Sequence, residues 1–137
     1  MARMPPGRLI PISSDDASGG TGGYTPALRA GDFVYVSGQG PLEPGTLAVL
    51  GETVAEQTRH TLRNVLTLVE AAGGDAGSIV RCGCYLASID DFDEFTAAYE
   101  EFFSHRPRPT RTTIGCQLAG ILVEIDCVAY IPQRGDV

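Results

Sequence analysis

The alternation of apolar and polar residues predicts short strands in the first third of the chain. Two runs with the composition of β-strands, at 27–29 and 33–37, flank a turn sequence at 30–32, so we expect a hairpin there. Residues 38–51 contain four glycines and two prolines and are expected to form a loop. Ahead of the hairpin, Leu9–Ile12 fits one further short strand within a segment rich in Gly, Pro and Ser.

Two later segments have the apolar spacing of amphipathic helices. Residues 53–72 begin with a capping box from Thr53 to Glu56, and two glycines follow them. Their apolar stripe consists of Val54, Thr58, Leu62, Val65, Leu66 and Val69. Residues 90–104 form the second predicted helix, with Ser88 or Asp90 as its cap and with a break at Pro107. Its expected buried side consists of Phe92, Phe95, Tyr99, Phe102 and Phe103.

Three further strands are predicted around and after the second helix. In the first, at 78–86, alternation places Val80, Cys82, Cys84 and Leu86 on one face. Residues 110–118 and 122–131 are the other two, and we expect the turn at 119–120 to join them as a hairpin. The last strand is almost continuously apolar, which is typical of a central strand buried on both faces.

The predicted order, ββ-α-β-α-ββ, indicates an α/β (α+β) domain of two layers, in which two helices pack on one face of a mixed sheet. The other sheet face also bears apolar residues, so we expect self-association. We divide the chain into a flexible leader at 1–23 with the possible strand, a domain at 24–132 and a tail at 133–137.

Composition narrows the classes of function. The net charge is −7, which argues against a nucleic-acid binder. All ten basic residues are arginine, so lysine Schiff-base chemistry and a lysine-anchored pyridoxal cofactor are excluded. The sequence has no signal-peptide pattern and no run long enough to span a membrane, so we expect a cytoplasmic protein with reduced thiols.

Glu124 is the most informative residue by pattern. It lies on the apolar last strand, and Asp126 shares its face. A buried carboxylate is costly unless it is paired or functional. Catalysis is one interpretation; an ion pair with a nearby arginine and exposure at the sheet edge are the others.

Arg111, at the entry to a strand, could bind a carboxylate through its planar guanidinium, or it could be a surface arginine. Cys82 and Cys84 have a metal-like spacing, but no second cysteine pair accompanies them, so we interpret them as core residues. Gly38 and Gly40 lack the remainder of a dinucleotide fingerprint, although their loop could approach a small anion. His60 has no partner for a Ser-His-Asp triad.

Several segments in the same order resemble the reactive intermediate deaminase (Rid, RidA/YjgF) family over about 24–131. The matching pieces are Gly23-Tyr24, 29–39, Gln57-Thr58 with Asn64, Asp91-Phe92, 99–103, 109–112 and 123–126. The resemblance implies a chorismate-mutase-like fold and a homotrimer with ligand pockets between subunits. It also implies hydrolysis of enamines or imines to 2-oxo acids and ammonia, without a metal or cofactor.

The resemblance also implies roles for individual residues. Arg111 matches the arginine that binds the substrate carboxylate, and Glu124 matches the carboxylate that orients the attacking water. Tyr24 matches a pocket tyrosine with an expected catalytic role. Gly38 matches a glycine whose backbone lines the pocket, and substrate contacts are expected from the neighbouring Ser37 and from Thr113 on the strand of Arg111.

The chain also departs from the family pattern. Thr113 stands where deaminating members often have cysteine, and Thr96 stands where many have asparagine. The turn after Leu118 is shorter than usual, and the leader is longer. These differences leave two alternatives to a small-imine deaminase, namely a pathway-specific enzyme for a larger substrate and a non-catalytic ligand-binding trimer.

Overall fold

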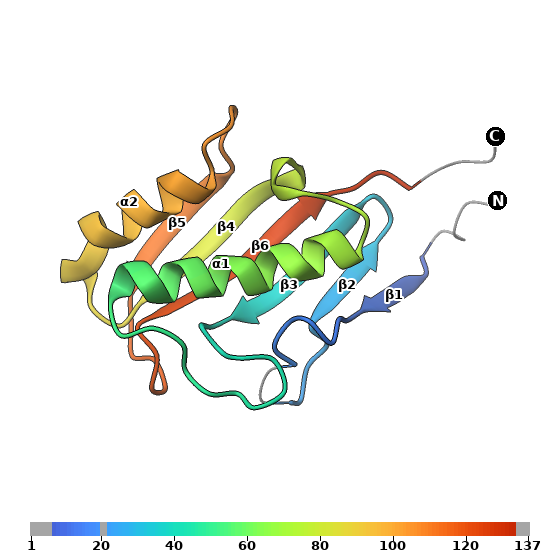
Figure 1. The fold of residues 1–137 in the computed structure, drawn as a ribbon. Helices are drawn as coiled ribbons and strands as arrows, with labels where there is room; N and C mark the ends of the chain where they lie inside the picture. Colours follow the sequence, from blue (N-terminus) through green and yellow to red (C-terminus); the bar gives the residue numbers. More distant parts are fainter. Residues whose placement is uncertain (1–6, 20–21, 134–137) are drawn as a thin grey trace.

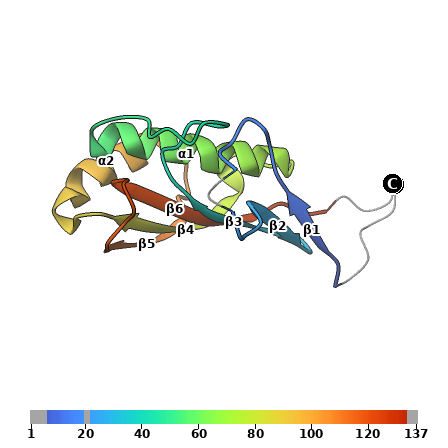
Figure 2. The same ribbon diagram turned by 90° about the horizontal axis from the view of Figure 1, so that it is seen from below.

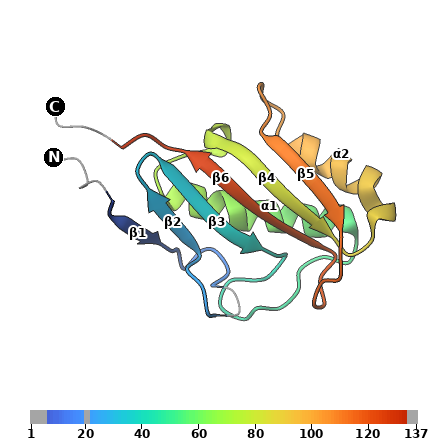
Figure 3. The ribbon, with the colours of Figure 1, turned by 180° about the vertical axis from the view of Figure 1, so that it is seen from behind.

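The computed structural model describes residues 7–19 and 22–133. Residues 1–6, 20–21 and 134–137, which belong to the expected leader and tail, lie outside the described residues. The described chain forms a six-stranded mixed sheet with both helices on one face, and the opposite face is bare in the single chain (Figures 1, 2 and 3). The two-layer α+β architecture is therefore confirmed.

The elements follow the predicted order, with the Leu9–Ile12 strand added at the start. They are β1 (Leu9–Ile12), β2 (Ala27–Ala30), β3 (Phe33–Gln39), α1 (Val54–Ala71), β4 (Ile79–Leu86), α2 (Phe92–Phe102), β5 (Thr110–Gly115) and β6 (Val123–Tyr130). Short 3-10 turns at Ala76–Ser78 and Ile89–Asp91 lead into β4 and α2. The strand order is β1-β2-β3-β6-β4-β5, and only β4 and β5 are parallel.

The predicted hairpin between the last two strands is wrong, because β4 lies between β5 and β6. The connecting segment crosses the end of β4. There, the Cys116 N–H donates to the Leu86 carbonyl (2.8 Å), and the Ala87 N–H donates to the Leu122 carbonyl (3.0 Å). α2 forms the crossover that makes β4 and β5 parallel, which leaves the other edge of β4 for β6.

Strand β6 is central, but in the single chain it is buried on one face only. Its residues alternate between fully buried and partly exposed, so the expectation of burial on both faces is wrong for the isolated chain. The predicted face of β4 also needs correction: Cys82, Cys84 and Leu86 are buried, but Val80 is 40% exposed. The register of β4 against β6 shifts between Ile79 and Arg81, and this irregularity turns Val80 away from the core.

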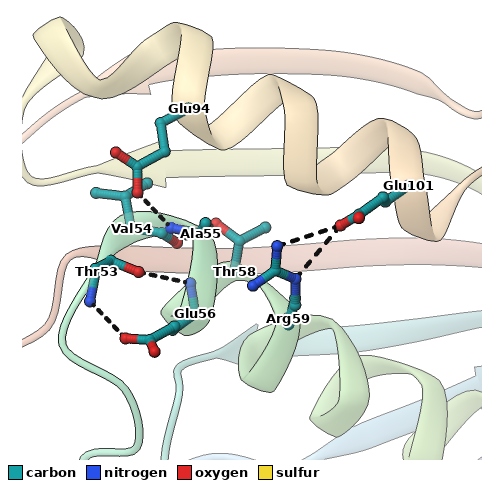
Figure 4. A network of polar contacts seen from close by, with 8 residues as sticks. All are labelled: Thr53, Val54, Ala55, Glu56, Thr58, Arg59, Glu94 and Glu101. Carbon is teal, nitrogen blue, oxygen red and sulfur yellow. Dashed lines mark hydrogen bonds and ion pairs between the residues drawn. The ribbon is translucent and has the colours of Figure 1, made fainter.

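Helix α1 begins as predicted. Thr53 is its N-cap: the Glu56 N–H donates to Thr53 Oγ1 (3.1 Å), and the Thr53 N–H donates to Glu56 Oε1 (3.0 Å), as Figure 4 shows. The first turn is also tied to α2, because the Ala55 N–H donates to Glu94 Oε2 (2.9 Å). Both carboxylates lie at the positive end of the helix dipole, where negative charge is favourable.

Helix α2 packs on the sheet through an aromatic row. Phe95 and Phe103 are fully buried and Tyr99 is nearly so, as predicted. Phe92, which was expected on the buried side, is 38% exposed at the start of the helix. An exposed ion pair between Arg59 and Glu101 (3.4 Å) joins α1 and α2 at the surface (Figure 4).

The core lies between the helices and the sheet. Its largest fully buried side chains include Leu62, Leu68, Leu86, Phe95, Phe103 and Ile125. In the part of the chain that the structure describes, no helix is both long and apolar enough to cross a membrane.

Candidate active site

A bulge in β3 brings four of the predicted site residues together. Pairing between β3 and β6 shifts between Val36 and Gln39, where Ser37 and Gly38 lie. Tyr24, Ser37, Gly38 and Glu124 line one cavity of about 600 Å³ on the bare face of the sheet. We call this cavity the open-face pocket.

Gly38 lies against the Glu124 carboxylate. A Cβ atom at this position would overlap Glu124 Oε2 and would lie 3.1 Å from the Cδ atom of that side chain. Only a residue without a side chain therefore leaves Glu124 in its observed place. Ser37 is held beside it, because its hydroxyl donates to the Thr25 carbonyl (2.6 Å).

Glu124 is half-buried, and its environment favours the protonated form. Burial, and secondarily the nearby negative charge of Asp126, raise the pKa of the Glu124 carboxyl above its ordinary value. Among the described residues no arginine forms an ion pair with Glu124. The ion-pair interpretation therefore fails for these residues, and a group that can both accept and donate a proton faces the pocket.

Asp126 lies on the same face and is held by β4. The Tyr85 hydroxyl donates to Asp126 Oδ2 (2.7 Å), and the Gly83 N–H donates to Oδ1 (3.2 Å). Arg81 approaches the same oxygen at 3.9 Å. These contacts fix Asp126 as a neighbouring carboxylate of Glu124. The hydrogen bond to Asp126 raises the pKa of the Tyr85 hydroxyl.

Arg111 lies in a second cluster, under α2. Its guanidinium carbon lies 4.8 Å from the ring centre of Tyr99, 5.3 Å from that of Phe92 and 5.5 Å from that of Phe95. Its Nη2 donates to Thr96 Oγ1 at 3.3 Å. Cation–π contacts with three rings fix the side chain in place.

No carboxylate of the described residues forms an ion pair with Arg111, and the side chain is only half-buried. Packing against three rings under α2 sets Arg111 apart from a freely solvated surface arginine. Thr113 lies two residues along β5 on the same face, and its buried hydroxyl has no hydrogen-bond partner within the described residues. The two threonines that depart from the family pattern, Thr96 and Thr113, thus lie near Arg111.

The two clusters lie on opposite faces of the sheet. Arg111 pairs in register with Cys82, which is buried beneath the helices, whereas Glu124 pairs with Tyr85, on the bare face. One strand, β4, also separates their strands (Figure 3). A small ligand therefore cannot contact both Arg111 and Glu124 within one chain.

Three of the four cysteines are core residues. Cys82, Cys84 and Cys127 are buried and Cys116 is half-buried, and all are free thiols. Burial raises the pKa of the Cys82 thiol to about 11. Within the described residues, no three His, Cys, Asp or Glu side chains are grouped to hold a metal ion.

Comparison with known proteins identifies the family. The family model described as Endoribonuclease L-PSP matches residues 15–131. The chain belongs to this family, the Rid or YjgF family. The RutC family protein SSO3206 of Saccharolobus solfataricus is 35% identical to this Rid-family chain over 120 residues, which cover 86% of the chain and 94% of that protein.

Solved structures agree with the fold. The Rid-family protein YyfA of Yersinia pestis is 26% identical, with a TM-score of 0.85, and the match covers 90% of this chain and 100% of that one. TdcF of E. coli, solved with bound serine, is 29% identical, with a TM-score of 0.81 over 88% of this chain and 98% of that one.

Sequence reasoning missed the residues that organise the two clusters. Tyr85 lies in an alternating strand with nothing to distinguish it from a surface tyrosine. The helical spacing predicts Phe92 as a core residue, whereas its ring lies against the Arg111 guanidinium at the start of α2.

Proposed function

We propose that this protein hydrolyses reactive enamines or imines that bear a carboxylate, producing 2-oxo acids and ammonia. The environment of Arg111 supports this most directly: a half-buried guanidinium, fixed by three aromatic rings, has no carboxylate partner among the described residues. Such a planar donor suits bidentate binding of a carboxylate. The serine bound to E. coli TdcF also bears a carboxylate.

The proposed site requires two copies of the chain. Because Arg111 and Glu124 lie on opposite sheet faces, one copy would supply Arg111, Thr96 and Thr113, and its neighbour would supply Glu124 and Gly38. The bare face also exposes large apolar side chains that a neighbour would cover, among them Phe33 (40%), Tyr35 (49%), Ile114 (45%) and Tyr130 (47%). A closed ring, and specifically a trimer, is our proposal for the assembly.

The chemistry is a hydrolysis in two stages. Arg111 binds the carboxylate and so places the imine carbon. Glu124 accepts a proton from water as the water oxygen bonds to that carbon, and the imine nitrogen takes up a proton from solvent. Glu124 then donates a proton to the amine nitrogen of the adduct. The C–N bond breaks, ammonia leaves, and the hydroxyl group loses its proton to solvent, which balances the proton taken up earlier and forms the 2-oxo acid. The raised pKa of Glu124 suits both transfers, since a group that titrates nearer neutrality exchanges protons in either direction.

Two other functions are less well supported. The family description names an endoribonuclease, but a net charge of −7 is unsuited to binding a polyanion. A trimer that binds ligands without turnover would need Arg111 but not Glu124. Glu124 is half-buried and forms no ion pair with the described residues, so it has no structural partner that would explain its burial. This favours the enzyme over the binder.

Two substitutions separate the enzyme from the binder. Arg111→Ala removes an interaction present in both the bound state and the transition state, so pyruvate affinity and turnover should both fall by about 10- to 100-fold. Glu124→Gln keeps the shape but cannot accept a proton. Pyruvate binding should survive this change while turnover falls by about 100-fold or more.

Calorimetry measures the affinity for pyruvate, and the release of ammonia from dehydratase-generated imines measures turnover. The matched control is Arg63→Ala, which changes an exposed arginine on α1. If Arg111→Ala binds pyruvate as wild type does, the site is wrong. If the wild type binds pyruvate but hydrolyses no imine, the binder replaces the enzyme.

A further inference from the structure

A second cavity opens beside Glu124, and we propose that it binds an apolar substituent of the substrate. This inference rests on the proposed function, because it treats Glu124 as part of the substrate site. The cavity has a volume of about 360 Å³, and we call it the annex. Glu124, Gly38 and Tyr24 line both the annex and the open-face pocket, so the two cavities adjoin at the reacting end of the site.

The far wall of the annex is aliphatic. It consists of Leu42, Leu47 and Val49 from the segment between β3 and α1 and of Ile121 from the turn before β6. Of the described residues that line the annex, only Glu124 is charged. An anionic substituent would face this carboxylate, whereas an aliphatic or aromatic one would contact the wall.

The wall is held in place by hydrogen bonds, so the annex is formed before a ligand arrives. In Figure 1 the segment between β3 and α1 passes beyond the end of β3. The side-chain amide of Asn64, buried on α1, donates to the carbonyls of Gly40 (2.9 Å) and Leu42 (3.0 Å) and accepts from the Ser18 N–H (3.3 Å). Leu42 also forms an isolated β-bridge with Val49. Pre-organisation of this kind lowers the entropic cost of binding.

Two wall residues are unusually exposed for their type. Leu47 is 39% exposed and Val49 is 46% exposed. Leu47 also has a φ of 63°, the left-handed region that leucine rarely adopts and that Gly or Asn adopts more readily. A leucine in this backbone conformation, half-exposed at the wall of a cavity, offers an apolar contact to a bound ligand.

The space inside the annex depends on a glycine. A Cβ atom at Gly40 would lie 3.0 Å from Ile121 Cδ1, which is tighter than ordinary contact. Any larger side chain at this position would enter the annex. The substrate class that follows is imines of 2-oxo acids with extended aliphatic or aromatic side chains, in preference to the imines of pyruvate or of 2-oxoglutarate.

Ligand binding tests the annex without requiring turnover. Calorimetry should compare pyruvate, 4-methyl-2-oxopentanoate and 2-oxoglutarate on the wild-type assembly. Each fully buried methylene strengthens binding about fourfold, so complete burial of the three additional carbons of 4-methyl-2-oxopentanoate would give about 60-fold tighter binding than pyruvate. With burial that ranges from partial to complete we expect about 10- to 60-fold. 2-Oxoglutarate should bind no more tightly than pyruvate. Equal affinity for all three, or a preference for 2-oxoglutarate, would overturn the inference.

Leu47→Asn is the decisive variant, because asparagine tolerates the left-handed backbone and removes the apolar contact. The preference for 4-methyl-2-oxopentanoate over pyruvate should fall by about fivefold or more, while pyruvate affinity stays unchanged. Leu9→Asn makes the same change at a residue that is 58% exposed on β1 and should keep the wild-type preference. Gly40→Val should also lower the preference, by filling the annex. An unchanged preference in Leu47→Asn would contradict the assignment.

The two proposals fail in different ways. If 4-methyl-2-oxopentanoate binds more tightly but no imine is hydrolysed, the annex stands and the deaminase does not. If imines of pyruvate and of 4-methyl-2-oxopentanoate are hydrolysed with the same kcat/KM and their 2-oxo acids bind equally, the deaminase stands and the annex does not.

Discussion

Gly38→Ala should separate the stability of the fold from the placement of Glu124. The new Cβ atom would overlap Glu124 Oε2, so the carboxylate must move by roughly 1 Å to reach an ordinary contact distance. Gly38 has no positive φ, so its backbone accepts alanine. Rotating the glutamate away from its preferred rotamer costs about 0.5–1.5 kcal/mol, which should lower the Tm by about 5 °C or less.

Turnover should respond far more strongly than stability to Gly38→Ala. Displacing a reacting group by about 1 Å can cost about 100-fold in rate. Ammonia release from a dehydratase-generated imine measures turnover, and thermal unfolding followed by circular dichroism measures stability. Both are recorded on the same preparations.

Gly83 provides a matched control on β4, which pairs with the other edge of β6. A Cβ atom there would lie 2.5 Å from Asp126 Oδ1 and 3.0 Å from the Tyr85 hydroxyl, so Gly83→Ala makes the same kind of clash with the other carboxylate. This variant should lose comparable stability but keep turnover within about fivefold of wild type, because Glu124 keeps its place. The reasoning is refuted if folded Gly38→Ala turns over at the wild-type rate, or if both variants lose turnover equally.

Three other changes test separate parts of the structure. Because the pKa of Glu124 is raised, its ionised form destabilises the folded state as pH rises through that pKa. Glu124→Gln should therefore increase the Tm at pH 8. The gain should vanish near pH 4, where residue 124 is uncharged in both folded proteins. A gain in Tm that does not depend on pH would contradict the raised pKa of Glu124. Cys82, whose buried thiol has its pKa raised to about 11, should not react with a disulfide reagent at pH 8 in the native protein, whereas half-buried Cys116 should react. Mass spectrometry after labelling measures this order, and modification of Cys82 before Cys116 would refute it. Arg29 donates to the backbone carbonyls of Ile131 (2.7 Å), Ala72 (3.0 Å) and Gly31 (3.1 Å). Arg29→Ala should therefore lower the free energy of unfolding, measured in urea, by about 2–4 kcal/mol. A loss below about 1 kcal/mol, the value of one ordinary hydrogen bond, would contradict a stabilising role for these contacts.

Local patterns were enough to predict the elements but not all of their pairings. The capping box at Thr53 and the glycines after α1 mark a helix whose ends the structure places within one residue of the prediction. The failure at β5 and β6 has a different cause. A short turn between two strand-like runs favours a hairpin, but the α2 crossover makes β5 a parallel neighbour of β4, and only long-range packing decides which edge β6 occupies.

The candidate site was predictable by residue type but not by geometry. Glu124 is visible as a carboxylate on an apolar strand. Alternation along single strands also indicates which residues share a face within one strand. It does not indicate that the face bearing Arg111 and the face bearing Glu124 are opposite, because that depends on the registers of β5 and β6 against β4. Neither Tyr85 nor the annex wall has a local signal, since each depends on contacts between distant segments.

The central claim is that one site uses Arg111 from one copy and Glu124 from another, and subunit mixing tests it most directly. Arg111→Ala and Glu124→Gln chains, each with strongly reduced turnover alone, are unfolded together in equal amounts, refolded and assayed for imine hydrolysis, with light scattering to confirm the assembly. Random mixing pairs an intact Arg111 with an intact Glu124 at about a quarter of the interfaces, so about a quarter of wild-type activity should return. If the mixed assemblies form but remain as inactive as either parent, the two residues do not meet across an interface, and the account of the site is wrong.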